Sequence, residues 1–203
     1  MTGSLERPCS GWVLAGGQSS RMGSPKALLE IGGRPLIARA VALLQSVCSA
    51  VTVVGSPAPY EHLGFAAIPD ECAQIGPLGG ILTALGRTTS DWNLIVACDL
   101  PYLTPEWLRY LASRAARSRA RVVLPQGPSG SEPLCAVYHR EAVVAIRAAV
   151  AQGRLKVTRA LEGLPIETVT PAEILPFDPR GVLFQNLNTP EDFERARADL
   201  ESR

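Results

Sequence analysis

The sequence is poor in the residues that build metal clusters and disulfide frameworks. Its 203 residues include two histidines and five cysteines, and no two cysteines form a CxxC pair. An odd, scattered set of cysteines fits neither a disulfide framework nor a zinc ribbon, and two histidines exclude a multi-histidine metal centre. We therefore expect the cysteines to be small buried side chains in a reducing compartment.

Long apolar runs and a strong net charge are also absent. The most apolar window, 38–54, is interrupted by Arg39 and Gln45, and no basic start followed by a long apolar stretch opens the chain. Such a sequence predicts neither a membrane span nor a signal peptide. A net charge of +1 gives no chain-wide attraction to polyanions. We expect a cytoplasmic protein that binds neither a membrane nor nucleic acid.

What the chain does contain is a regular alternation of short apolar runs and longer amphipathic stretches. Thr104 and Thr189 each precede a proline and an acidic residue, the pattern of a capped helix start. Alternating strands and helices predict a single α/β domain with a mainly parallel sheet covered by helices on both faces. The predicted strands are 11–15, 51–54, 65–68, 93–97, 122–124 and 134–138, and the predicted helices are 35–47, 78–85, 105–117, 141–152 and one after Thr189.

The first predicted strand runs into a glycine-rich loop that ends at one of the chain's two lysines. Residues 14–26 read LAGGQSSRMGSPK, with Gly16, Gly17 and Gly23 beside Arg21 and Lys26. Glycines let backbone N–H groups approach an anion closely, and the two cations suit phosphate oxygens. Neither GxxxxGK[ST] nor GxGxxG is present. The loop therefore indicates a polyphosphate site of another kind, the alternative being a flexible glycine turn with incidental charges.

Acidic and amide side chains follow other predicted elements. Asp99 comes directly after the strand 93–97 and is predicted to bind a divalent cation. Asp70 follows 65–68 and either accepts hydrogen bonds from a base or ribose or closes a turn. Asn186 and Asn188 precede the last helix, where they either face the site or act as caps.

Taken in order, LAGGQSSRMGSPK, PD, GPLGG, CDLP and NLNTPEDF resemble the molybdenum cofactor guanylyltransferases. The resemblance runs from about residue 11 to 195 and implies a Rossmann-like three-layer sandwich of the nucleotide-diphospho-sugar transferase type. It also implies one nucleotidyltransferase domain over 1–203. A nucleotide-binding half would cover about 9–105 and an acceptor-binding half about 106–203.

The resemblance implies roles for individual residues. Leu14, Ala15 and Gly16 would line the nucleotide pocket through their backbone, and Asp70 would contact the guanosine. Lys26 would contact the phosphates, Asp99 would bind Mg²⁺ and the nucleotide, and Arg21 and Lys26 would stabilise the leaving pyrophosphate. Asn186 and Asn188 occupy the family's asparagine pair. Gly55 stands where the family pattern leads us to expect an asparagine that contacts the nucleotide, which leaves recognition at this corner to the backbone or another side chain.

The implied reaction transfers GMP from GTP to the terminal phosphate of molybdopterin and releases pyrophosphate. The alternatives are a molybdopterin cytidylyltransferase or another small-molecule nucleotidyltransferase, and a non-catalytic nucleotide-binding protein. Partners would be GTP and molybdopterin, with other proteins of cofactor synthesis or recipient molybdoenzymes as further candidates. Outside the site, we expect Arg114, Arg117 and Arg121 to form a solvated helix face, and the three tryptophans to pack in the core or at the edge of the domain.

Overall fold

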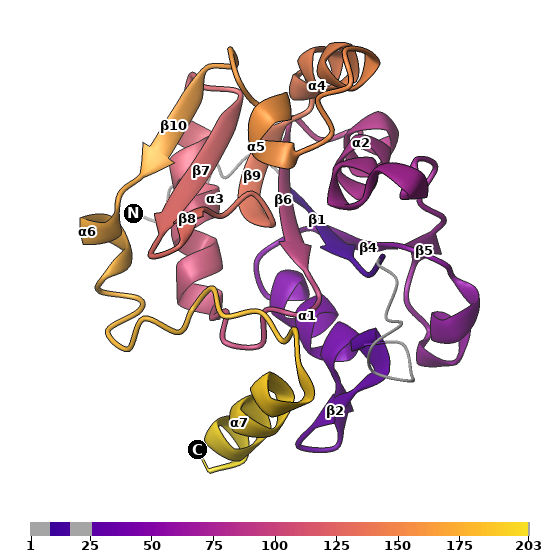
Figure 1. The fold of residues 1–203 in the computed structure, drawn as a ribbon, viewed down its shortest axis with the longest axis vertical. Helices are drawn as coiled ribbons and strands as arrows, with labels where there is room; N and C mark the ends of the chain where they lie inside the picture. The colour runs from indigo at the N-terminus through magenta and orange to yellow at the C-terminus, as the bar shows by residue number, and fades with distance from the viewer. Residues whose placement is uncertain (1–8, 17–25, 203) are drawn as a thin grey trace, which may run out of the picture.

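The computed structural model describes residues 9–16 and 26–202, and it has a mixed sheet at its centre (Figure 1). The strand order is β10-β7-β9-β6-β1-β4-β5, and β8 pairs with the C-terminal end of β7. The strands of this sheet are β1 (Cys9–Leu14), β4 (Ala50–Val54), β5 (Ala67–Ile68), β6 (Trp92–Ala97), β7 (Val122–Gly127), β8 (Gly130–Ser131), β9 (Cys135–His139) and β10 (Ile166–Val169).

Helices cover both faces of this sheet, as the sequence predicts. The side chains of a strand alternate between faces, so Val13 packs toward α1 and α3 while Trp12 and Leu14 pack toward α2 and α4. The result is a three-layer α/β sandwich. The helices are α1 (Leu36–Gln45), α2 (Pro77–Arg87), α3 (Pro105–Arg117), α4 (Ala142–Ala151), α5 (Val157–Ala160), α6 (Pro171–Ile174) and α7 (Pro190–Glu201), with short 3₁₀ helices η1 (Lys26–Leu28), η2 (Ala58–Leu63) and η3 (Ala73–Ile75).

Local sequence signals place the helix starts well. The Thr104 hydroxyl accepts a hydrogen bond from the backbone N–H of Trp107, and α3 covers the predicted residues 105–117. Thr189 and Asp192 form a reciprocal capping box at the start of α7. The three tryptophans are buried, as expected, at 5% exposure or less.

One strand breaks the parallel pattern. β9 lies between β6 and β7 and pairs antiparallel with both. It therefore joins the parallel strands β4, β1 and β6 to the pair β7 and β10. The sequence predicted neither β10 nor the short strands β8, β2 (Glu30–Ile31) and β3 (Arg34–Pro35).

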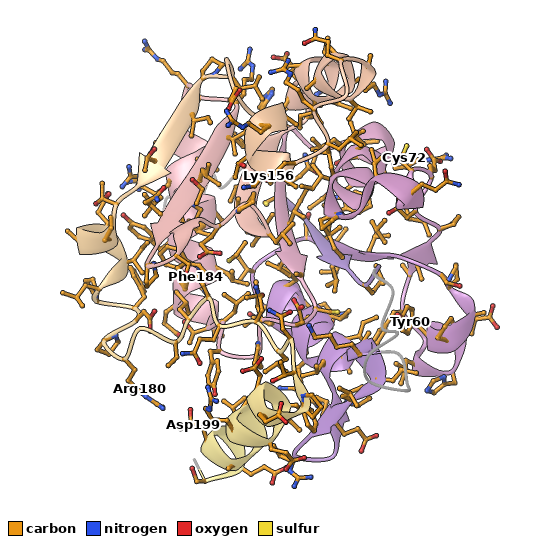
Figure 2. The ribbon with its side chains drawn as sticks, viewed as in Figure 1. Tyr60, Cys72, Lys156, Arg180, Phe184 and Asp199 are labelled. Atoms are coloured by element: carbon orange, nitrogen blue, oxygen red, sulfur yellow. The ribbon has the colours of Figure 1, made fainter. Side chains whose placement is uncertain are left out.

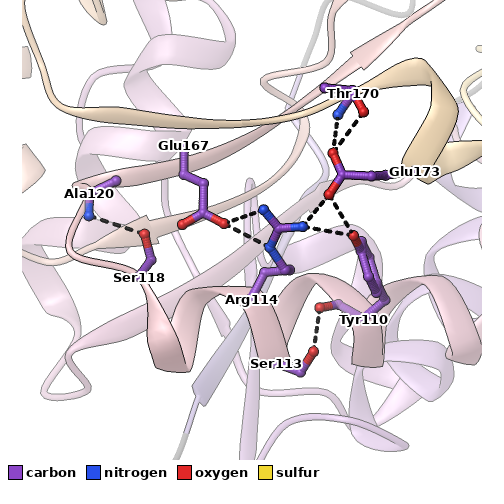
Figure 3. Close-up of polar contacts among 8 residues, drawn as sticks. All are labelled: Tyr110, Ser113, Arg114, Ser118, Ala120, Glu167, Thr170 and Glu173. Carbon is purple, nitrogen blue, oxygen red and sulfur yellow. Dashed lines mark hydrogen bonds and ion pairs between the residues drawn. The ribbon is translucent and has the colours of Figure 1, made fainter.

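The arginine face predicted for α3 is only partly a solvated surface. Arg114 forms ion pairs with Glu167 of β10 and Glu173 of α6, and its guanidinium also donates to the Tyr110 hydroxyl (Figure 3). Glu173 in turn accepts hydrogen bonds from the backbone and hydroxyl of Thr170. The prediction was wrong for Arg114 because its carboxylate partners come from elements far along the chain.

The C-terminal part of the chain returns to the N-terminal half. After α6, residues 175–189 run along the lower edge of the sheet in Figure 1 and lead into α7. A small core holds α7 in place through Ile31, Leu36, Leu187 and Ala196. Within the described residues, none of the helices combines the length and apolar character that crossing a bilayer requires.

Candidate functional site

The candidate site lies where β1, β4 and β6 end side by side. The backbone N–H of Ala15 donates to the carbonyl of Val54 at 2.9 Å, and that of Cys98 donates to the carbonyl of Leu14 at 3.1 Å. These bonds continue the parallel pairing one residue past the strand ends. They bring Gly16 and Asp99 to the carboxyl edge, the usual place for a ligand in an α/β sheet.

Three predicted residues meet at this edge. The Lys26 Nζ lies 2.5 Å from Oδ2 of Asp99 and 3.4 Å from Oδ1 of Asn188. The side chains of Lys26 and Asp99 are 19% and 22% exposed, so the pair is shielded yet reachable. Residues from the start, middle and end of the sequence therefore form one polar cluster.

The backbone fixes the position of Asn188 beside this pair. The N–H of Leu187 donates to the carbonyl of Asp99 at 3.2 Å, which ties the segment before α7 to the end of β6. Thr189, not Asn188, caps α7, so the Asn188 amide is available to Lys26. Asn186 is exposed on the same segment.

Asp70 lies at the other side of Gly16. Its Oδ1 accepts hydrogen bonds from the Cys72 N–H at 2.8 Å and the Thr83 hydroxyl at 3.1 Å. Its Oδ2 lies 4.0 Å from the point where a β-carbon on Gly16 would be. Asp70 therefore both closes a turn and presents an oxygen toward the glycine loop, so the two interpretations of this residue are compatible.

Gly79 in α2 makes this turn possible. A β-carbon at Gly79 would lie 2.1 Å from the carbonyl oxygen of Cys72 and 3.1 Å from Oδ1 of Asp70. Only glycine allows the helix to approach the turn so closely. The GPLGG segment thus supports Asp70 through packing.

Gly55, which follows β4, lies close to the backbone of Ala15. A β-carbon there would lie 3.2 Å from the carbonyl oxygen of Ala15, closer than ordinary packing. The same carbonyl accepts a hydrogen bond from the hydroxyl of Tyr60 at 3.2 Å. Burial raises the pKa of Tyr60, so it remains a donor at neutral pH. Sequence reasoning missed Tyr60 and Thr83, because neither stands in a motif.

The cysteines are all free, but not all are buried. Cys135 is buried and Cys72 is exposed, so the expectation of uniformly buried thiols was wrong. Burial raises the pKa of Cys98, next to Asp99, to about 12. That thiol is protonated at neutral pH and is a poor nucleophile.

Two further observations concern groups that could bind a metal ion and a cavity beside α1. Among residues 9–16 and 26–202, no three acidic, cysteine or histidine side chains are grouped to hold a metal ion. A cavity of about 320 Å³ lies between α1 and the residues after β6, but its lining includes neither Lys26 nor Asp99. Arg21, Gly17 and Gly23 lie outside the described residues.

Comparison with known proteins shows the family to which this chain belongs. The sequence model of the MobA-like NTP transferase domain matches residues 11–165. A molybdenum cofactor guanylyltransferase of Syntrophotalea carbinolica is 33% identical over 91% of this chain and 89% of its own length. A probable molybdenum cofactor guanylyltransferase of Pelotomaculum thermopropionicum is 34% identical over 95% of this chain and 94% of its own.

A solved structure extends the similarity to three dimensions. The crystal structure of molybdopterin-guanine dinucleotide biosynthesis protein A from Archaeoglobus fulgidus superposes with a TM-score of 0.83 at 26% identity. The match covers 96% of this chain and 100% of that one. The Rossmann-like sandwich predicted from the sequence is confirmed.

Proposed function

This chain belongs to the molybdenum cofactor guanylyltransferase family, with its MobA-like NTP transferase domain, and we propose that it transfers GMP from GTP to the terminal phosphate of molybdopterin. The products are molybdopterin guanine dinucleotide and pyrophosphate. The observation that supports this proposal most directly is the cluster of Lys26, Asp99 and Asn188 at the carboxyl edge of the sheet.

In this proposal GTP lies along the edge with its guanosine toward Asp70. Leu14, Ala15 and Gly16 provide backbone contacts, and the Tyr60 hydroxyl holds the Ala15 carbonyl in place. The triphosphate extends toward Lys26, whose ammonium group neutralises charge on the leaving pyrophosphate. Arg21, from the glycine loop, is assigned the same task.

The residues present fit a divalent cation bound together with the nucleotide. Mg²⁺ takes oxygen ligands and is usually held by one or two carboxylates plus substrate phosphates. Asp99 offers one partly exposed carboxylate at the edge, and the Oδ1 of Asn188 lies within reach of the same lysine. Mg²⁺ on Asp99 would supply charge neutralisation at the α-phosphate.

A direct displacement is the simplest chemistry for these side chains. The acceptor phosphate attacks the α-phosphorus in line, a P–O bond forms, and the bond to pyrophosphate breaks. The thiol of Cys98, the residue before Asp99, is partly buried, and its raised pKa keeps it protonated, so it does not compete as a nucleophile. The protein then contributes positioning and charge neutralisation.

The test is product analysis with four nucleotides. Purified protein, molybdopterin and Mg²⁺ are incubated with GTP, CTP, ATP or UTP, and dinucleotide and pyrophosphate are quantified. We expect equal amounts of both products with GTP and little with the others. A preference for CTP would establish the cytidylyltransferase alternative, and nucleotide binding without turnover would contradict an enzymatic role.

A cytoplasmic location and transfer of the product to other cofactor proteins or molybdoenzymes are further parts of this proposal.

A further inference from the structure

A partly exposed carboxylate, that of Glu132, lies at the same edge of the sheet. Glu132 follows β8 and is partly exposed. Among the described residues, none forms a hydrogen bond or ion pair with its carboxylate, and burial raises its pKa. Partial burial of an unpaired carboxylate has an energetic cost that a ligand rich in N–H donors would offset.

The position of Glu132 is closely defined. A β-carbon on Gly127 would lie 2.6 Å from Oε1 of Glu132 and 3.0 Å from Cδ2 of Phe184, so both side chains cover this glycine. The Glu132 backbone N–H donates to the carbonyl of Pro125 at 2.9 Å. Phe184 is buried and packs edge-on against Trp107, with ring centroids 5.7 Å apart. Figure 2 shows Phe184 where β7 and β8 turn. The Glu132 carboxylate therefore lies over Gly127, on the same glycine as the apolar ring of Phe184.

Backbone hydrogen bonds connect the segments around this carboxylate to the end of β6. The Ala97 N–H donates to the carbonyl of Leu134 at 2.9 Å, close to both Glu132 and Asp99 in the sequence. Leu187, three residues after Phe184, donates to the carbonyl of Asp99 at 3.2 Å. The segments that carry Glu132 and Phe184 are therefore both hydrogen-bonded to the end of β6, where Asp99 lies.

Glu132 and Asp70 lie on opposite sides of Asp99. Asp70 follows β5, which is separated from β6 by β1 and β4, whereas Glu132 precedes β9, the neighbour of β6 on the other side. Because neighbouring strands are about 4.8 Å apart, Asp70 and Glu132 belong to different ends of the edge. A nucleotide with its base near Asp70 leaves the Glu132 end for the acceptor.

We propose that Glu132 recognises the acceptor by accepting hydrogen bonds from the 2-amino and ring N–H groups of its pterin. This inference rests on the proposed function and adds a specificity-determining residue to it. Guanine carries the same 2-amino-4-oxopyrimidine edge, so the test must separate the two sources.

The test compares Glu132→Gln with the wild type and with Glu162→Gln. Glutamine keeps the shape of the side chain but places an N–H₂ donor against the donors of the pterin. Glu162 is an exposed carboxylate that pairs with Arg159, and it serves as the matched control. Circular dichroism and thermal melting check folding, and Glu132→Asp is the second variant if Glu132→Gln does not fold. The measurements are KM for molybdopterin, Kd for molybdopterin by fluorescence titration, and Kd for GTP.

We expect Glu132→Gln to raise both acceptor constants about tenfold or more, since hydrogen bonds to a charged group are lost. Its Kd for GTP and all constants of Glu162→Gln should change less than about twofold. Unchanged acceptor constants would overturn the proposal. A weaker Kd for GTP with an unchanged acceptor KM would overturn it too, because Glu132 would then face guanine. If the wild type forms no dinucleotide, the proposed function fails, while the molybdopterin titration still reports on Glu132.

Discussion

Lys26 and Asp99 were the site residues that local sequence signals could single out, although their mutual contact was not predicted. Each follows a strong local signal, the glycine loop for the lysine and a buried strand for the aspartate. In the structure the Lys26 Nζ lies 2.5 Å from Oδ2 of Asp99. Tyr60 and Thr83 carry no such signal, because their roles depend on contacts that exist only in the folded chain.

Replacing Lys26 with alanine should lower the rate of transfer about a hundredfold, because an oriented charge at developing negative charge contributes about 3 kcal/mol. The measurement is kcat/KM for GTP. Lys156→Ala is the control, since Lys156 is the chain's other lysine and is exposed near α5 (Figure 2). Equal rates for wild type and Lys26→Ala would remove Lys26 from the site.

Asp99→Asn should abolish measurable transfer, with a loss of about a thousandfold or more, because the amide keeps the volume but loses the charge that binds a cation. Its melting temperature should stay close to that of the wild type. The control is Asp91→Asn, because Asp91 is a partly exposed aspartate that pairs with Arg140. Near-native turnover by Asp99→Asn would contradict the metal-binding role.

Among the elements, helices were predicted more accurately than strand directions. Thr104 and Thr189 specify helix starts through their own side-chain hydrogen bonds. β9 was recognised as apolar, but a buried apolar run carries no information about the direction in which it pairs. Only Val169 is buried among the four residues of the short strand β10, so it lacks the apolar pattern of a buried strand.

Two glycines of α2 offer a matched test of close packing. Gly79→Ala should destabilise the protein by about 2 kcal/mol or more, because its β-carbon would lie 2.1 Å from the Cys72 carbonyl oxygen. Gly86→Ala meets only the end of the Arg147 side chain and should be neutral or stabilising by about 0.5–1 kcal/mol, as alanine favours helix. Urea unfolding measures both. Equal stabilities for the two variants would contradict the close approach at Gly79.

The network that joins α3 to α6 should make stability depend on pH. Hydrogen bonds from Thr170, and then the Arg114 contact, lower the pKa of Glu173 to about 2 from an ordinary value of 4.5. A lowered folded-state pKa means that this stabilisation is complete above about pH 4.5 and is lost as the pH falls toward about 2. Unfolding free energies between pH 6 and pH 3 should fall less for Glu173→Gln than for the wild type. Parallel pH curves would contradict the assignment.

At the scale of the whole molecule, α7 holds the C-terminal segment against the N-terminal half. Ala196 is 1% exposed in the small core with Ile31 and Leu36. The guanidinium of Arg180, in the preceding segment, donates hydrogen bonds to both carboxylate oxygens of Asp199 in the same helix (Figure 2). The position of Asn188 beside Lys26 therefore depends on the docking of α7.

Ala196→Asp should undock α7, because a buried carboxylate has no partner in this core. We expect a lower melting temperature and a transfer rate reduced about tenfold or more, since Asn188 loses its position. Ala198→Asp, on the exposed side of α7, is the control. A native rate in Ala196→Asp with a clearly lower melting temperature would show that α7 contributes stability but does not position the site.

The return of residues 175–189 to the edge of the sheet has a consequence for the order of events during synthesis. Domains generally begin to fold from the N-terminal side as a chain emerges from the ribosome. Lys26 and Asp99 are made early, but Asn188 and α7 can reach them only after the intervening segment has left the ribosome. A nascent chain that still lacks these residues can form the sheet without a complete site. The cluster of Lys26, Asp99 and Asn188 is therefore completed late in translation, after the residues of the sheet have been made.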